Sequence, residues 1–138
     1  MKATNYTAIA TAKGGRSGHV KTNDGVLDLK VSVPVAFGGQ DNGYTNPEQL
    51  FAAGWAACFD NALIMVAKAK KIDLESTTTV EATLGAQDDG SFGLSAVIKV
   101  KIDNLPTEDA KKIIEGAHRV CPYSKATKGN INVEIIQL

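Results

Sequence analysis

The sequence predicts an α+β fold in which short strands flank one long central helix. Strand-like segments separated by glycine-rich turns occupy the first forty residues, and a long apolar helical segment follows them. Two more strands, a second helix and a last strand complete the chain. This order of elements is typical of an α+β arrangement.

The amino-terminal strands are predicted from their turns. Residues 6–12 and 18–22 form a hairpin joined through Lys13-Gly14-Gly15. Asn23-Asp24-Gly25 is a strong signal for a tight turn, and residues 26–35 form the strand that follows it. Residues 38–43 then form a polar, glycine-rich loop.

The long helix is predicted to begin at Asn46-Pro47-Glu48 and to end near Lys71. Asparagine is a good cap, proline suits the first helical position, and a carboxylate is favoured in the first turn. From Leu50 to Ala67 the helix is apolar nearly all the way round, as expected for a helix enclosed by other structure. A chain of 138 residues has little material to enclose such a helix alone, so a dimer interface is a reasonable hypothesis.

Residues 50–69 also have about the right length for a membrane span. This segment carries Asp60, Asn61 and Lys68, and its many alanines lower its hydrophobicity. We therefore interpret it as a buried helix of a soluble protein and expect no membrane association.

The carboxyl-terminal half continues with strands at 80–86 and 94–102, joined by a turn at Asp88-Asp89-Gly90. A second helix begins with a cap at residues 107–109, ends near Val120, and carries one apolar face. That face consists of Ala110, Ile113, Ile114 and Ala117. A new turn begins at residues 121–124, and residues 131–136 form the last strand.

Composition restricts the classes of function. The length suits a single domain, residues 1–138, and 15 basic against 15 acidic residues give no nucleic-acid-binding footprint. The amino terminus lacks the apolar core of a signal peptide, so we expect a cytoplasmic protein. In a reducing cytosol two cysteines are not expected to form a permanent structural disulfide. Three roles are left for the two cysteines: inert core thiols, metal ligands or a redox pair.

Four residues could carry redox chemistry. Cys58 lies in the middle of the long helix, where a cysteine is often only a small buried hydrophobe. Cys121 lies at a junction between a helix and a proline, where a thiol can be accessible and its thiolate favoured. Arg16 lies among glycines that allow a tight turn, although it also fits a solvated hairpin. Glu48 could simply stabilise the first turn of its helix.

Together these residues permit thiol peroxidase chemistry. A peroxidatic thiol must be deprotonated, a nearby arginine favours the thiolate, and a carboxylate can hold the guanidinium in place. A second thiol can condense with the sulfenic acid that peroxide leaves behind. Glu48 and Cys58 are ten positions apart, however, which is about 15 Å along an unbroken helix. Either the helix breaks, for example near Gly54, or Glu48 serves the Cys58 of a partner chain.

A metal site would have to use the two cysteines with His19 and His118. Only His118 and Cys121 are closely spaced, and the chain has no Cys-x-x-Cys or His-x-x-x-His pair. We therefore predict no metal site and no bound cofactor.

Two long motifs, each centred on a cysteine, resemble those of the organic hydroperoxide resistance proteins, which belong to the superfamily of osmotically inducible protein C. Residues 46–59, NPEQLFAAGWAACF, resemble the central-helix motif of the family, and residues 120–130, VCPYSKATKGN, its second cysteine motif. Residues 14–18 and 24–28 are similar to its arginine loop and the hairpin after it. The similarity covers essentially the whole chain.

The resemblance implies a function. Cys58 matches the peroxidatic cysteine and Cys121 the resolving cysteine, while Arg16 and Glu48 match the pair that organises the site. Members of the family reduce organic and fatty-acid hydroperoxides and are recycled by dihydrolipoyl groups on lipoylated proteins. Their fold is an intertwined homodimer in which sheets enclose the central helices.

An apolar substrate pocket is implied as well. We expect Phe37, Phe51 and Trp55 in its wall, although aromatic residues of this kind are as often plain core. Trp55 stands where the family usually has tyrosine, and Lys128 where arginine is common. Three alternatives stay open: an osmotically inducible relative of broader specificity, a redox-insensitive dimer that binds apolar ligands, and a metal-binding structural protein.

Overall fold

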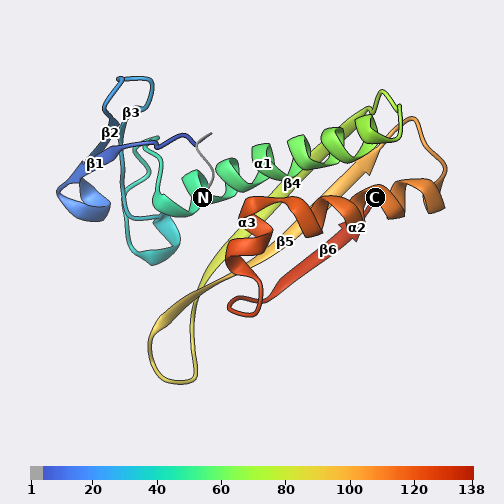
Figure 1. Cartoon of the computed structure of the whole chain (residues 1–138). Helices are drawn as coiled ribbons and strands as arrows, with labels where there is room; N and C mark the ends of the chain where they lie inside the picture. The colour runs from blue at the N-terminus through green and yellow to red at the C-terminus, as the bar shows by residue number, and fades with distance from the viewer. Residues whose placement is uncertain (1–4) are drawn as a thin grey trace. The chain divides into compact units, whose positions relative to one another are not determined.

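Residues 5–138 are described by a computed structural model, and they group into two units that meet in sequence between Leu50 and Phe51. The first four residues of the segment tested for a signal peptide lie outside this description. The first unit contains a small sheet, and the second contains a larger sheet with its helices (Figure 1).

The sheet of the first unit has the strand order β1-β2-β3 and is antiparallel. Its strands are β1 (Ala10–Lys13), β2 (His19–Thr22) and β3 (Asp28–Lys30), and short 3₁₀ helices occupy Gly15–Ser17 and Val35–Phe37. The hairpin and its turn are therefore where the sequence predicted them.

Two strands of this unit are shorter than predicted. The predicted strand at residues 26–35 is reduced to the three residues of β3, because Val31 forms an isolated bridge with Thr45 and Pro34 starts a 3₁₀ turn. Proline has no N–H for a ladder hydrogen bond. The first strand likewise begins at Ala10 and not at residue 6.

Helix α1 (Pro47–Ala69) forms as predicted and is the longest element of the chain. The Asn46 side chain accepts a hydrogen bond of 2.8 Å from the backbone N–H of Gln49, which caps the first turn. The helix runs without a break through Gly54 and ends before Lys71, whose φ of 60° is left-handed. The helix is long and apolar enough to cross a membrane by length and composition alone. The core helix of a soluble protein meets the same two criteria.

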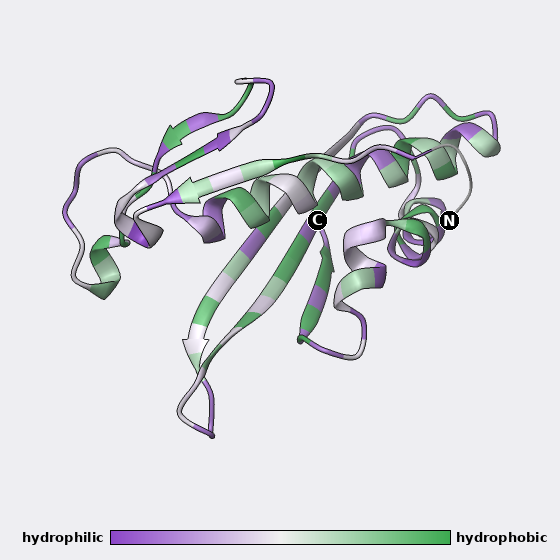
Figure 2. Ribbon diagram, turned by 60° about the vertical axis from the view of Figure 1, so that its left-hand side comes forward, coloured by the Kyte–Doolittle hydropathy of each residue, from purple (hydrophilic) through white to green (hydrophobic). Residues whose placement is uncertain are grey.

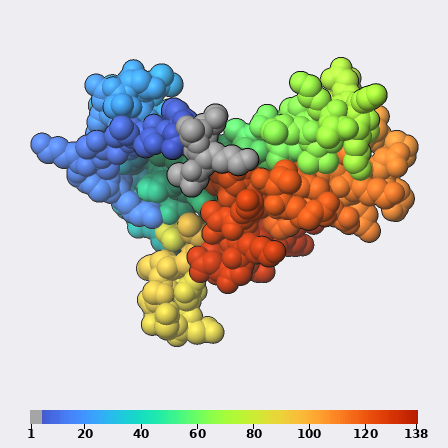
Figure 3. All heavy atoms as spheres, viewed as in Figure 1, coloured from blue at the N-terminus to red at the C-terminus, as the bar shows by residue number. Residues whose placement is uncertain are grey.

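The second unit is built on the sheet β4-β5-β6. Strands β4 (Ser76–Ala86) and β5 (Phe92–Ile102) form an antiparallel hairpin, and β6 (Val133–Gln137) pairs in parallel with β5. Figure 2 shows the alternation of hydropathy along these strands. The end of the hairpin stands away from the rest of its unit (Figure 3).

Strand β4 begins four residues earlier than predicted. Threonine is β-branched and favours strands, and the hydroxyls of Ser76 and Thr78 both donate to Asp60 on α1, at 2.9 and 2.8 Å. These two hydrogen bonds fasten the beginning of β4 to the helix.

Helices α2 (Thr107–Val120) and α3 (Pro122–Thr127) connect β5 to β6. The predicted cap at Thr107 is wrong: Thr107 is already helical, Pro106 precedes it, and no side chain caps this end. The predicted apolar face is confirmed, since Ala110, Ile113, Ile114 and Ala117 are all buried.

The core of the second unit lies between these helices and the sheet. Trp55, Phe59 and Leu63 of α1 pack with residues of β5 and α2 that are also fully or almost fully buried, including Ile98, Val100 and Ile113. Each such side chain stabilises the fold by about 1.5–3 kcal/mol relative to an exposed one. On the opposite side of α1, Ile64 and Met65 are 42% and 61% exposed in the single chain.

Candidate active site

Arg16 and Glu48 form a two-pronged ion pair within the first unit. The Arg16 guanidinium donates from Nη1 to Oε2 of Glu48 at 2.8 Å and from Nη2 to Oε1 at 2.6 Å. Such a bidentate pair fixes the plane and direction of the guanidinium as well as its position. A carboxylate thus holds the arginine fork, as the two residue types suggested.

The turn that carries Arg16 depends on its glycines. Gly14 and Gly15 have left-handed φ angles of 86° and 58°, which favour glycine. A Cβ atom on Gly18 would lie 1.8 Å from the carbonyl oxygen of Lys13, so no other residue fits there without a backbone shift. Glu48, the partner of Arg16, lies in the first turn of α1.

The ion pair changes the titration of both groups. The hydrogen bonds from Arg16 lower the pKa of the Glu48 carboxyl, and the pair raises the pKa of Arg16 further above its usual value. Both partners are therefore charged at neutral pH. This arrangement presents a fixed cation.

The two thiols meet within the second unit. Cys58 lies on α1 and Cys121 at the junction of α2 and α3, yet their sulfur atoms are 3.6 Å apart. A disulfide requires the sulfurs to approach by only about 1.5 Å more. Both cysteines are free thiols here.

The two thiols differ in exposure. A thiol before a proline can be accessible, but Cys121 is not: it is 0% exposed and belongs to the core. Proline at the first position of α3 continues the chain directly into a new helix, so the junction stays packed. Cys58 is partly exposed and is the thiol that a solute can reach first.

Burial raises the pKa of the Cys58 thiol because it disfavours the thiolate. A hydrogen bond from the backbone of Tyr123 works in the opposite direction, and the neighbouring Cys121 thiol adds to the increase. The net direction is upward. Cys58 needs a cation in addition to these neighbours to be a thiolate at neutral pH.

Aromatic side chains gather within the two helical turns before Cys58. The Phe51 and Trp55 rings are edge to face at 5.5 Å, and Tyr123 lies 6.3 and 6.4 Å from them. Two of the three predicted wall residues, Phe51 and Trp55, therefore lie together. The third, Phe37, belongs to the first unit, at the end of the 3₁₀ turn at Val35–Phe37.

Sequence reasoning missed two features of this cluster. The Tyr123 backbone, which favours the Cys58 thiolate, left no signal because every residue except proline supplies an N–H. The Trp55 indole Nε1 is buried without a hydrogen-bond partner among the described residues. A donor in an aromatic wall could have been suspected from tryptophan standing in that position.

The residues considered for a metal are dispersed. His19 forms an ion pair with Asp28 in the first unit, whereas His118 packs near Phe59 in the second. Within residues 5–138 no group of three histidine, cysteine or acidic side chains is arranged to hold a metal ion.

Comparison with known proteins agrees at three levels. Residues 38–136 match the model of the OsmC-like protein family. The organic hydroperoxide resistance protein OhrB of Bacillus subtilis is 44% identical over 131 residues, which cover 94% of this chain and 96% of that protein. The crystal structure of an organic hydroperoxide resistance protein from Elizabethkingia anophelis superposes with a TM-score of 0.92 at 47% identity, over 99% and 98% of the two chains.

The chain belongs to the organic hydroperoxide resistance proteins of the OsmC-like family.

A further crystal structure, of an organic hydroperoxide resistance protein from Legionella pneumophila, gives a TM-score of 0.91 at 45% identity, with 96% of each chain covered. The segment matched to the OsmC-like family includes Glu48, Cys58 and Cys121, whereas Arg16 precedes it. The α+β architecture with its long helix is thus that of organic hydroperoxide resistance proteins.

Proposed function

We propose that the protein is a thiol peroxidase that reduces organic hydroperoxides to alcohols and thereby contributes to organic hydroperoxide resistance. The observation that carries this proposal is the separation of 3.6 Å between the sulfurs of Cys58 and Cys121. Two thiols that are 63 residues apart in sequence and adjacent in space suit a reversible disulfide. The names of the relatives supply the class of oxidant.

The reaction begins at Cys58. Its thiolate attacks the terminal oxygen of the hydroperoxide, the O–O bond breaks, and the alkoxide takes a proton and leaves as the alcohol. Cys58 becomes a sulfenic acid. The Cys121 sulfur then attacks the Cys58 sulfur, hydroxide leaves as water after taking the thiol proton, and the disulfide closes. The partial exposure of Cys58 and the burial of Cys121 support this division of roles.

Arg16 supplies the cation that Cys58 needs. Its guanidinium remains charged at any physiological pH, and Glu48 holds it by two hydrogen bonds. Beside the thiol, the guanidinium would lower the thiol pKa and polarise the peroxide bond. The upward pKa shift that Cys58 has from its own unit supports the assignment of this role to Arg16.

We place the Arg16–Glu48 pair beside the Cys58 of a partner chain in a homodimer. Helix α1 is continuous, so ten residues separate Glu48 from Cys58 by about 15 Å along its axis. The same helix exposes Ile64 and Met65, and only 28% of its apolar window is buried in the single chain. An apolar helix that is mostly uncovered in one chain supports burial against a second copy.

The aromatic cluster of Phe51, Trp55 and Tyr123 provides an apolar wall close to Cys58. Such a wall favours alkyl and fatty-acid hydroperoxides over hydrogen peroxide, since apolar surface gains free energy when it leaves water. We propose that Phe37 completes the wall. The disulfide returns to two thiols by exchange with an external dithiol, such as a dihydrolipoyl group of a lipoylated protein, in the cytoplasm.

The test is a count of free thiols in the reduced protein after one equivalent of cumene hydroperoxide, with hydrogen peroxide in parallel. We expect rapid loss of both thiols with the organic peroxide and slow loss with hydrogen peroxide. Dihydrolipoamide should then restore two thiols. If both thiols survive both oxidants, the cysteines are structural and the proposal fails.

A further inference from the structure

A cationic cavity lies where α2 ends and α3 begins. It has a volume of about 470 Å³ and is lined by His118, Arg119, Ser124, Lys125 and Lys128. All five residues belong to the second unit. None of them has a part in the proposed peroxidase reaction.

The three cations of this cavity lack anionic partners. Arg119, Lys125 and Lys128 form no ion pair with any carboxylate in the part of the chain that the structure describes. All three side chains are exposed to solvent, so they are free to pair with an anion that enters the cavity.

Two neutral groups in the cavity also lack partners. Ser124 is 2% exposed, and its hydroxyl makes no hydrogen bond within residues 5–138. Nδ1 of His118 is also buried and makes no hydrogen bond within these residues. Buried polar groups are nearly always hydrogen-bonded, and a hydroxyl and a protonated ring nitrogen are both donors.

Helix dipoles explain only part of this pattern. Arg119 lies in the last turn of α2 and Lys125 in the last turn of α3, where cations are favoured. That effect requires neither a buried hydroxyl nor a buried ring nitrogen without a partner. A bound acceptor accounts for the cations and the orphaned donors together.

We propose that the cavity formed by His118, Arg119, Ser124, Lys125 and Lys128 is a binding site for a phosphate group. A carboxylate would balance only one of the three cations. Phosphate carries a charge of about −1.5 to −2 at neutral pH and three strong acceptor oxygens, so it matches both the charge and the number of donors. The source is inorganic phosphate or a small phosphate monoester.

His118 provides a direct spectroscopic readout. Burial and the positive charge of Lys128 lower the pKa of this histidine. A bound dianion should oppose both effects and raise the pKa of His118 again. His19, which pairs with Asp28 in the first unit, is the internal control in the same spectrum.

The experiment is an NMR titration of the histidine rings with inorganic phosphate at constant ionic strength, with sodium chloride and sodium acetate in parallel. We expect a saturable shift at His118, none at His19, and a much weaker response to chloride and acetate. Glycerol phosphate serves as a second probe, and the tighter of the two phosphates identifies the source.

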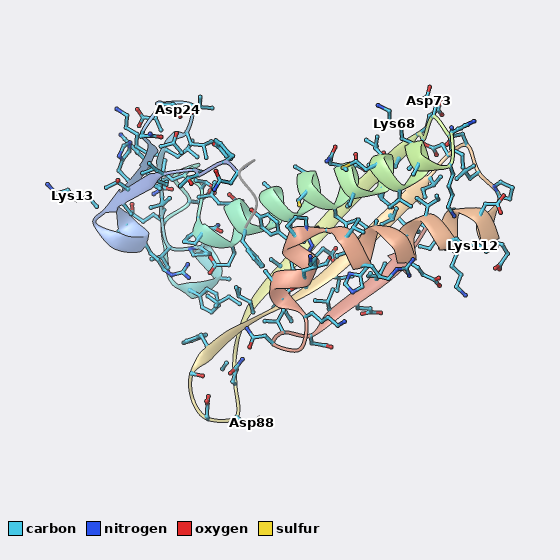
Figure 4. All side chains as sticks on the ribbon, viewed as in Figure 1. Lys13, Asp24, Lys68, Asp73, Asp88 and Lys112 are labelled. Atoms are coloured by element: carbon cyan, nitrogen blue, oxygen red, sulfur yellow. The ribbon has the colours of Figure 1, made fainter. Side chains whose placement is uncertain are left out.

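Three variants locate the site. Lys128→Gln and Ser124→Ala should each weaken phosphate binding by about fivefold or more, because each removes a donor. Lys112→Gln is the matched control, since Lys112 is an exposed lysine earlier on α2 and outside the cavity (Figure 4). Thermal unfolding of each variant checks the fold.

The result that overturns the proposal is a His118 shift that is equal for phosphate and chloride, or unchanged in Lys128→Gln. The titration is repeated in a Cys58→Ser protein, which cannot turn over peroxide under the proposed mechanism. Binding there should be unchanged, so failure of the phosphate site and failure of the peroxidase proposal are distinguishable.

Discussion

The sulfur of Cys121, which is fully buried, lies 3.6 Å from the sulfur of Cys58, which is partly exposed. One thiol is therefore reachable by a solute, and the other is reachable only by the first. This asymmetry defines how the two cysteines should differ when each is replaced.

Replacement of the cysteines should separate the two proposed steps. Cys58→Ser should consume no thiol when cumene hydroperoxide is added, because Cys121 is shielded from the oxidant. Cys121→Ser should consume one thiol equivalent and then stall or over-oxidise, because no second thiol can condense with the sulfenic acid. Thiol counting measures the consumption of thiol in each variant, and intact mass detects over-oxidation. Equal turnover in the two variants would contradict the assignment.

Replacement of Arg16 should impair formation of the thiolate. Arg16→Ala should raise the pKa of Cys58 and slow peroxide reduction about tenfold or more at pH 7, with partial recovery as the pH rises. The pH dependence of thiol alkylation reports the pKa directly. Lys13→Ala is the control, because Lys13 is three residues from Arg16 and makes no ion pair with a described carboxylate. It should change neither the Cys58 pKa nor the rate of peroxide reduction appreciably. Alkylation profiles that coincide for wild type and Arg16→Ala would remove Arg16 from the mechanism.

Mixing of an impaired variant with an inactive one tests whether the site is shared between chains. In a heterodimer of Arg16→Ala with Cys58→Ser, one of the two sites would combine an intact Arg16 with an intact Cys58. Random assembly should therefore restore about a quarter of wild-type activity. If Arg16 acts on its own chain, every site in the mixture is defective, and activity stays at background.

Glu48 should stabilise the fold in a pH-dependent way. Its pKa is lowered by Arg16, so this contribution is present above the ordinary value of 4.5 and is lost as the pH falls through the lowered value. The difference in unfolding free energy between wild type and Glu48→Gln should be about 1 kcal/mol or less at pH 7 and should shrink in acid. Urea unfolding across this pH range measures it.

The control for that experiment is Glu108→Gln. Glu108 occupies the first turn of α2 without an arginine partner within the described residues, so it isolates the effect of the helix dipole. An equal pH dependence in the two variants would show that the bond to Arg16 contributes nothing to stability.

Gly54 should be required for packing although it lies inside a helix. A Cβ atom there would lie 2.6 Å from the Tyr123 hydroxyl oxygen and 3.2 Å from the ring carbon that carries it. Gly54→Ala should destabilise the protein by about 1–3 kcal/mol, in spite of the better helix propensity of alanine. The cost should fall in a Tyr123→Phe background. Gly85→Ala, which meets no atom within 4 Å, is the control.

Local signals made the helix predictable and tertiary effects made the sheet less so. Asn46, Pro47 and Glu48 act within one turn, and α1 begins where they indicate. Residues 26–35 have the hydrophobicity of a strand, and this led to the prediction of one long strand. The strand is shorter because Val31 bridges to Thr45 and Pro34 starts a 3₁₀ turn. The extension of β4 depends on Asp60, which is far away in sequence.

The candidate site was predictable in its residues but not in its geometry. Spacing could not reveal that Cys121 is buried or that its sulfur touches that of Cys58, because 63 residues of folded chain bring them together. The contribution of Tyr123 comes from its backbone, which carries no residue-specific signal.

If the proposed disulfide forms, the burial of Cys121 also determines which of its two sulfurs a reductant attacks. Once the disulfide has formed, an incoming thiolate can approach in line only at Cys58, and Cys121 is then the leaving group. Under the proposed mechanism, the mixed disulfide with the reductant would therefore form on Cys58, and the second thiol of the donor would release it there. A single atom would thus receive both the oxidant and the reductant, and the peroxide and the electron donor would compete for one entrance.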